Sequence, residues 1–225
     1  MLHAALLLAT LFGLSLHVDP AFLDPGLPPM ELVVAADVSS GPAPAEPTYG
    51  ELMEQRQRVA GVHKILGIST FAAMAGTLAL GIIQYRNLYG AFASRRDNPC
   101  ARGHATFGQG QCSGTPWLHL LSGLTTFALY TTTFSLAVAM PDPGGLDEGR
   151  GAFARRLRLH KLLRWVHLIG MAVQMGLGFV IANGARFGID RANNYSTLRA
   201  LSTVHLAAGV VTFAALGWSG YLMAF

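Results

Sequence analysis

The sequence predicts an all-α integral membrane protein: a polytopic bundle of four membrane-spanning helices, preceded by a short N-terminal apolar segment. Hydrophobic residues make up 52% of the 225 residues and charged residues only 12%, about half the charge usage of a water-soluble domain. The mean hydropathy is +0.40. Four stretches without Asp, Glu, Lys or Arg are each about 20 residues or longer, the length that an α-helix needs to cross the hydrocarbon core of a bilayer.

The composition also excludes other classes of protein. The apolar content is too high for an intrinsically disordered chain, and the 26 glycines follow no fixed period that would indicate collagen. The net charge of +4 comes from Lys and Arg spread over the segments between the apolar stretches, which is typical of membrane-flanking charge. A nucleic-acid-binding surface would gather its basic residues on one face, so we expect membrane lipid and no nucleic acid as a partner.

Two segments precede the four apolar stretches. Residues 1–18 are apolar and contain no acidic residue; we interpret them as a secretory signal peptide that lacks a basic n-region, or as an extra membrane helix. Residues 19–55 are acidic and rich in Pro and Ala, which predicts a flexible tail. Residues 56–225 then form the predicted membrane domain.

The four stretches in that domain are predicted as helices, because an open strand in lipid would leave backbone N–H and C=O groups without partners. Lys64 and Arg86 flank the first, Pro141 follows the second, Arg164 and Arg186 flank the third, and the fourth reaches the end of the chain. The predicted spans are residues 65–85, 116–140, 165–185 and 200–225.

The sequence leaves the orientation of these helices open. A cleaved signal peptide would place segments 86–115 and 186–199 in the cytoplasm with seven Arg, whereas the other side carries nine Lys or Arg and is the one that the positive-inside rule favours. Cys100 and Cys112 lie in the first of these segments. A disulfide between them would require an oxidising compartment, and two free thiols would suit a reducing one.

Histidines recur in or beside all four predicted helices, at His63, His119, His160, His167 and His205. Ionisable residues at membrane depth are costly and mark function, although a single one can be a hydrogen-bonded packing residue. Because consecutive helices run in opposite directions, the histidines sort into two layers: His63 with His160 or His167, and His119 with His205. At about 1.5 Å of rise per residue, the layers would be roughly 20 Å apart.

Each layer therefore offers two imidazoles from different helices, the arrangement that bis-histidyl ligation of a haem iron requires. Three of the histidines also begin the spacing H-x3-G-x3-F. Residues four apart share a helix face, so the glycine would leave space for a porphyrin edge and the phenylalanine would pack on the ring. These residues are Gly67 and Phe71, Gly123 and Phe127, and Gly209 and Phe213.

With these motifs, residues 56–225 resemble the cytochrome b561 family of transmembrane electron-transfer proteins. The third predicted helix adds Gln174, Gly178 and Phe179 at a similar distance from His160. The resemblance implies four helices with one histidine ligand each, and two non-covalently bound b-type haems on opposite sides of the membrane. It pairs the first helix with the third and the second with the fourth. The long segment with two cysteines and the acidic tail depart from the family.

The third ligand has two candidates, because His160 and His167 are seven residues apart and share a helix face. The family-like spacing to Gln174 favours His160, whereas the position of His167 inside the charge-free stretch favours His167. We predict His167 as the iron ligand, with His160 near the haem edge. Basic residues nearby would neutralise haem propionates or anchor the helix at the interface: Arg158, Lys161 and Arg164.

The expected function is electron transfer across the membrane through two haems. By resemblance, the donor is a quinol or an ascorbate-like molecule, and the acceptor is ferric iron or a redox partner protein. The alternatives are a membrane anchor subunit of a larger redox complex and a haem-free small transporter. The chain would act as a homodimer or a complex subunit, and its 14 Arg against 2 Lys suggest a high-GC bacterium and hence an inner membrane.

Overall fold

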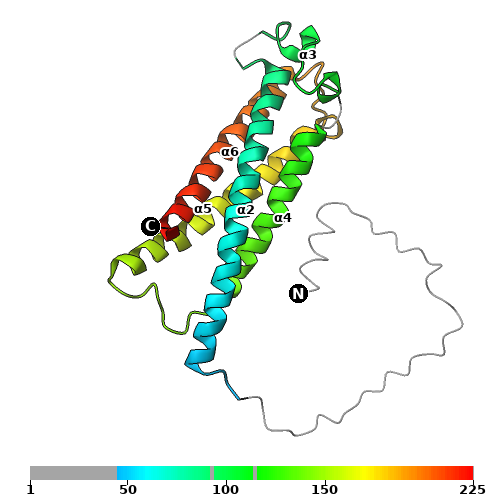
Figure 1. Cartoon of the computed structure of the whole chain (residues 1–225). Helices are drawn as coiled ribbons and strands as arrows, with labels where there is room; N and C mark the ends of the chain where they lie inside the picture. The colour runs from blue at the N-terminus through cyan, green and yellow to red at the C-terminus, as the bar shows by residue number, and fades with distance from the viewer. Residues whose placement is uncertain (1–44, 92–93, 114–115, 225) are drawn as a thin grey trace, which may run out of the picture. The chain divides into compact units, whose positions relative to one another are not determined.

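The computed structural model describes residues 45–91, 94–113 and 116–224, and from Glu46 onward these belong to one compact unit, Glu46–Phe225. Every regular element in the described residues is helical. Four helices are long and apolar enough to cross a membrane: α2 (Tyr49–Tyr89), α4 (Trp117–Ala139), α5 (Ala152–Ala182) and α6 (Tyr195–Ala224). The predicted all-α fold with four spans is therefore confirmed (Figure 1). The expectations for residues 1–18 and 19–44 lie outside the described residues.

Helix α2 begins at Tyr49, so the predicted boundary of the flexible tail at residue 55 is too late. Thr48 and Glu51 form a capping box: the Thr48 hydroxyl accepts from the Glu51 backbone N–H at 3.3 Å, and the Glu51 carboxylate accepts from the Thr48 N–H at 2.7 Å. This box satisfies two N–H groups at the start of the helix. The acidic residue thus marks a helix start and not a continuing tail.

Helices α2, α5 and α6 also begin before the charge-free stretches, whereas α4 keeps within its predicted bounds. Helix α5 begins at Ala152, thirteen residues before the predicted span at 165, and α6 begins at Tyr195, five residues before 200. Short elements fill the connections: α3 (Pro99–Arg102), η2 (Gln109–Gln111) and η3 (Gly184–Phe187). Charged residues near the ends of a long membrane helix can stay in the interfacial zone, so they do not end the helix.

The bundle is built from two closely packed pairs of helices, α2 with α4 and α5 with α6, and α2 also packs against α6. Thr70 and Thr133 hydrogen-bond between α2 and α4 with their hydroxyls 3.1 Å apart. Gly170 lets α5 approach α6, since a Cβ there would lie 2.1 Å from the Thr212 hydroxyl oxygen. Small residues and interhelical hydroxyl bonds are the usual means of helix association in lipid.

Helices that face each other diagonally meet across the interior through side chains. Helix α2 faces α5, and α4 faces α6, through histidine rings. Between these contacts lies a core cluster of Met74, Tyr130 and Met171, against which partly buried apolar residues pack: Phe127, Phe134, Leu168, Phe213 and Leu216.

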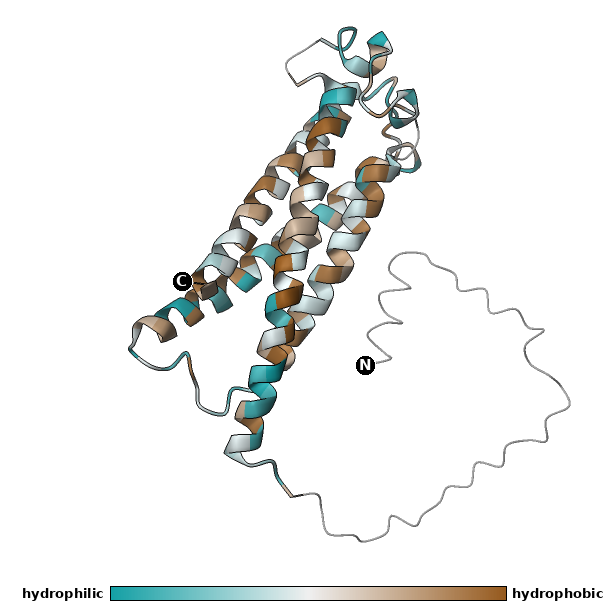
Figure 2. Ribbon diagram, viewed as in Figure 1, coloured by the Kyte–Doolittle hydropathy of each residue, from teal (hydrophilic) through white to brown (hydrophobic). Residues whose placement is uncertain are grey.

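Hydropathy follows the pattern of a membrane bundle. Figure 2 shows apolar residues along the length of the helices and hydrophilic residues gathered at their ends. Large apolar side chains also face outward, including Ile65, Ile68, Ile169 and Val211. Exposed apolar side chains on all four long helices are typical of contact with lipid.

One end of the bundle carries a cap, residues 94–113, which contains a disulfide between Cys100 and Cys112. The sequence left open whether the two cysteines are paired or free, and the structure pairs them. Asn87 in α2 holds the cap, because its side chain donates to the Thr106 carbonyl and accepts from the Thr106 N–H, both at 3.0 Å. Gln84 donates to the Gln111 carbonyl at 2.7 Å.

Candidate functional site

Two pairs of histidines meet across the interior of the bundle. His63 of α2 faces His160 of α5, with ring centres 6.2 Å apart and ring planes at 86°. His119 of α4 faces His205 of α6, with ring centres 6.0 Å apart and ring planes at 89°. The structure thus brings together the predicted His119/His205 layer, and it matches His63 with the first of its two predicted partners.

The Nδ1 atoms of three of these rings bind backbone carbonyl groups. The His63 ring binds Thr133 O at 3.1 Å, the His119 ring binds Thr77 O at 3.2 Å, and the His160 ring binds Ser219 O at 2.9 Å. A carbonyl oxygen only accepts, so an Nδ1 that binds one donates its proton, and the Nε2 of that ring keeps a free lone pair. His160 Nδ1 also lies 2.9 Å from the Ser219 hydroxyl, which then accepts from it as well. Metal-ligating histidines have this outer hydrogen bond, which fixes the tautomer and the ring rotation.

The fourth ring, that of His205, is held differently. Its Nδ1 is buried and has no hydrogen-bond partner among the described residues. Gln174 of α5 donates its amide N–H to the His205 backbone carbonyl at 2.8 Å, so it holds the main chain of α6 at this level.

The ring of His167, the ligand that the sequence favoured, faces Tyr130 of α4 and not His63. Its Nδ1 is 2.9 Å from the Tyr130 hydroxyl, and both side chains are buried. It therefore packs against α4, whereas His160 is the ring that faces His63. The prediction of His167 as the ligand does not agree with this geometry. That prediction estimated the depth of each histidine in the membrane from the charge-free stretch, whereas α5 begins thirteen residues before that stretch.

The predicted phenylalanines do not lie on the histidine rings. Phe71 and Phe213 stack on each other, with ring centres 4.6 Å apart and planes at 11°. Phe127 packs against the core cluster. All three therefore belong to the apolar layer between the two histidine pairs.

The three predicted glycines do not lie against the histidine rings either. A Cβ on Gly67 or Gly123 would meet only a threonine methyl group, at 4.0 and 3.9 Å, and one on Gly209 would meet the Gln174 amide at 3.4 Å. The glycines beside the rings are Gly81, where a Cβ would lie 3.0 Å from the His119 ring, and Gly178, where it would lie 3.5 Å from the His205 ring.

Sequence reasoning missed the role of Gly81. The only signal for it was a small residue on the first helix at the depth of His119, and small residues are frequent throughout these helices.

The distance between the two pairs follows from positions on single helices. On α4, His119 belongs to one pair, and Thr133 binds His63 of the other pair. On α6, His205 belongs to one pair, and Ser219 binds His160 of the other pair. Each interval is fourteen residues, which corresponds to roughly 21 Å along an α-helix. This agrees with the predicted separation of the layers.

The donor set at each level fits a haem better than a bare metal ion. An ion bound at about 2 Å to one nitrogen of each of two imidazoles places the ring centres about 6 Å apart, as in both pairs. Across the part of the chain that the structure describes, no group of three or more His, Cys, Asp or Glu could hold a metal. Two histidine nitrogens would suffice for a haem, which would bring the other nitrogen ligands of its iron.

A charge cluster lies at the His63/His160 end. Arg56 of α2 pairs with Asp142 at 3.2 Å, and Lys161 of α5 pairs with Asp142 at 3.2 Å and with Asp147 at 2.8 Å. The hydrogen bond from the Lys161 ammonium holds the pKa of the Asp147 carboxyl below its usual range. These pairs tie the α4–α5 connection to both helices that carry the histidines.

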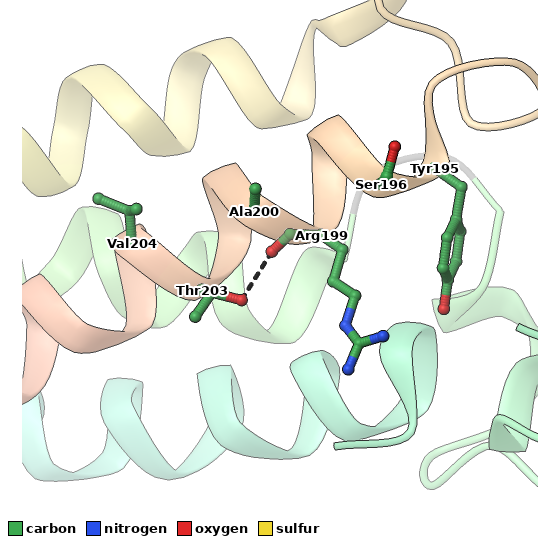
Figure 3. Close-up of a pocket in the computed structure, with 6 residues that line it drawn as sticks. All are labelled: Tyr195, Ser196, Arg199, Ala200, Thr203 and Val204. Carbon is green, nitrogen blue, oxygen red and sulfur yellow. Dashed lines mark hydrogen bonds between the residues drawn. The ribbon is translucent and has the colours of Figure 1, made fainter. Parts of the chain in front are cut away.

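A surface groove of about 490 Å³ lies at the other end, along α6. Figure 3 shows its lining residues, with Arg199 extending from α6 toward the end of α2, where it donates to the Ala91 carbonyl at 3.0 Å. No histidine lines this groove. The groove therefore lies apart from the two histidine pairs.

A scan against protein-family models, a search of curated proteins and a search of solved structures found no match to this chain. The resemblance to the cytochrome b561 family accordingly stays a prediction, and the proposal below depends on the geometry of the histidines.

Proposed function

We propose that the chain is a transmembrane electron-transfer protein that holds two b-type haems, one between His63 and His160 and one between His119 and His205. The observation that carries the proposal is the pair of matching histidine contacts, 6.2 and 6.0 Å between ring centres, at two levels of one membrane bundle. By its resemblance to the cytochrome b561 family, the chain would take electrons from a quinol or ascorbate-like donor. It would pass them to an acceptor on the opposite side.

When bound, haem supplies one-electron oxidation and reduction at its iron. The chain's own residues contribute position and environment. Carbonyl groups of Thr133, Thr77 and Ser219 fix three of the imidazoles, and the apolar helices exclude water from the interior. Each histidine pair lies toward one end of the bundle, so a donor and an acceptor on opposite sides could each approach one site.

The Arg-rich composition supports placing the protein in a bacterial inner membrane, where the two sides differ in redox environment. Exposed apolar helix faces also leave room for a second copy or a partner subunit within the membrane.

The test is a reduced-minus-oxidised visible spectrum of detergent-purified protein with haem extracted and counted per chain. Two low-spin b-type haems per chain are expected. His160→Ala and His119→Ala should each retain one haem, and the matched control His167→Ala, seven residues from His160 on the same helix, should retain two. Haem-free protein from cells with ample haem would refute the proposal.

A second assay addresses transfer itself. Protein in liposomes that enclose ferricyanide should consume the ferricyanide when a membrane-impermeant reductant is added outside. Liposomes with the His160→Ala variant should not. Equal rates for the two proteins would show that the bundle does not carry electrons through both sites.

A further inference from the structure

Two arginines flank the α5 histidine in a pattern that no other helix repeats. Arg156, His160 and Arg164 are spaced four residues apart and share a helix face. At the other three histidines of the two pairs, the residue four positions later is glycine: Gly67, Gly123 and Gly209. The difference points to a requirement of the His63/His160 site alone.

Both arginines have an unused buried hydrogen-bond donor. The Nε atoms of Arg156 and Arg164 are buried and have no hydrogen-bond partner among the described residues, and neither side chain forms an ion pair there. The Arg164 guanidinium lies 5.9 Å from the centre of the Phe134 ring and 5.3 Å from that of Trp165. An aromatic face attracts a cation but accepts no strong hydrogen bond from Nε.

The neighbouring cations on α5 are already engaged. Lys161 pairs with Asp142 and Asp147, and Arg158 donates to the backbone carbonyl groups of Asp147 and Gly149. None of the ion pairs among the described residues joins Arg156 or Arg164 to an acidic residue of the α4–α5 connection. The two arginines are half-buried and keep one buried, unpaired donor each, which calls for an acceptor that reaches it from within the bundle.

The inferred anion is the carboxylate of the group held by this histidine pair. A side chain on an α-helix leans toward the N-terminus, so the Arg164 guanidinium lies near the level of His160. Haem carries two propionates, and a guanidinium binds a carboxylate with directed, charge-assisted hydrogen bonds. A lipid phosphate at the surface would not reach a donor whose Nε is fully buried.

We infer that Arg156 and Arg164 bind the two carboxylates of the haem at His63/His160 and that their charge stabilises its reduced form. This inference rests on the proposed function. A unit charge about 10 Å away at an effective dielectric constant of about 20 changes a one-electron equilibrium by roughly tenfold. Tenfold corresponds to 59 mV.

The experiment is a potentiometric titration of purified wild type, Arg156→Gln, Arg164→Gln and the charge-conserving Arg164→Lys. The matched control is Arg155→Gln, an exposed cation on the same helix that donates only to the Arg150 carbonyl. Each inner Gln variant should lower the midpoint potential of one haem by about tenfold in equilibrium constant. Arg164→Lys and Arg155→Gln should change it less than threefold. Equal shifts in Arg155→Gln and Arg164→Gln, or two bound haems with no shift, would overturn the inference.

A second arm identifies the anion. Apoprotein is reconstituted with the dimethyl ester of haem, which has the same iron and no carboxylates. Wild type and Arg164→Gln should then bind the ester with the same affinity, whereas Arg164→Gln should bind native haem more weakly than wild type does. A loss of affinity in Arg164→Gln that persists with the ester would show that the arginine binds another anion, such as a lipid phosphate, and would overturn the inference. Wild-type protein that binds no haem would instead refute the proposed function.

Discussion

Removing the hydrogen bond between Tyr130 and His167 should destabilise the bundle without loss of haem. The two groups are 2.9 Å apart, and only 3% of Tyr130 and 7% of His167 are exposed. A net hydrogen bond contributes about 0.5–1.5 kcal/mol, and an unpaired buried partner costs about 1–3 kcal/mol. Interhelical hydrogen bonds in membrane proteins average about 0.6 kcal/mol and reach about 1.7. We therefore expect Tyr130→Phe to cost about 1–2 kcal/mol.

A double-mutant cycle isolates the bond from other effects of each change. Tyr130→Phe, His167→Leu and the double variant are unfolded in mixed micelles by titration with dodecyl sulfate, and haem is counted in each. The coupling free energy should be about 1 kcal/mol, because the second change removes a partner that has already lost its bond. All three variants should keep two haems. A coupling below about 0.3 kcal/mol would place the two sites within ordinary additivity and refute the bond. Loss of one haem in His167→Leu would restore His167 as the ligand.

Three further outcomes follow from other parts of the bundle. Gly81→Ala should displace the His119 ring, since the new Cβ would lie 3.0 Å from it, and should lower haem occupancy to between one and two per chain, while Gly76→Ala, with nothing within 4 Å, should keep both. Asp147 has a lowered pKa through Lys161, so its contribution to stability is present above the ordinary Asp pKa of about 3.9 and is lost as pH falls below it. Asp147→Asn should therefore show a smaller fall in melting temperature than wild type between pH 7 and 3, and an equal fall would contradict this. In the proposed bacterial inner membrane, the cap should face the periplasm, because disulfides persist in oxidising compartments. An impermeant maleimide should then label its thiols in intact spheroplasts after reduction, and labelling only after membrane disruption would contradict this orientation.

The architecture could be predicted because membrane helices are fixed by local composition. Four charge-free stretches became four spans, and antiparallel order alone placed His119 level with His205. The residues at which the helices begin and end were harder to predict. Helices α2, α5 and α6 begin among charged residues before their charge-free stretches, and the capping box at Thr48 starts α2 inside a segment that looks like a tail.

The details of the site could not be predicted, because they depend on contacts between residues far apart in the chain. The His63 ring binds a carbonyl seventy residues away, and His160 binds one fifty-nine residues away. Every residue has a carbonyl group, so the sequence carries no sign of which one will serve. His160 and His167 share a face, and only the true start of α5 tells which lies level with His63.

The residues between the two histidine pairs bear on what can cross the bundle. Phe71 stacks on Phe213 at 4.6 Å between ring centres, and Met74, Met171 and Tyr130 are buried beside them. A path for a solute or an ion would need polar walls or water at this level, since desolvation in an apolar interior is costly. An electron needs neither, because it passes between centres without a solvated path. The phenylalanines of the H-x3-G-x3-F motif therefore have a different role from the one that the sequence suggested. Phe71 and Phe213 pack on each other in the middle of the bundle. His63 and His205, which begin the same two motifs, lie on opposite sides of this contact.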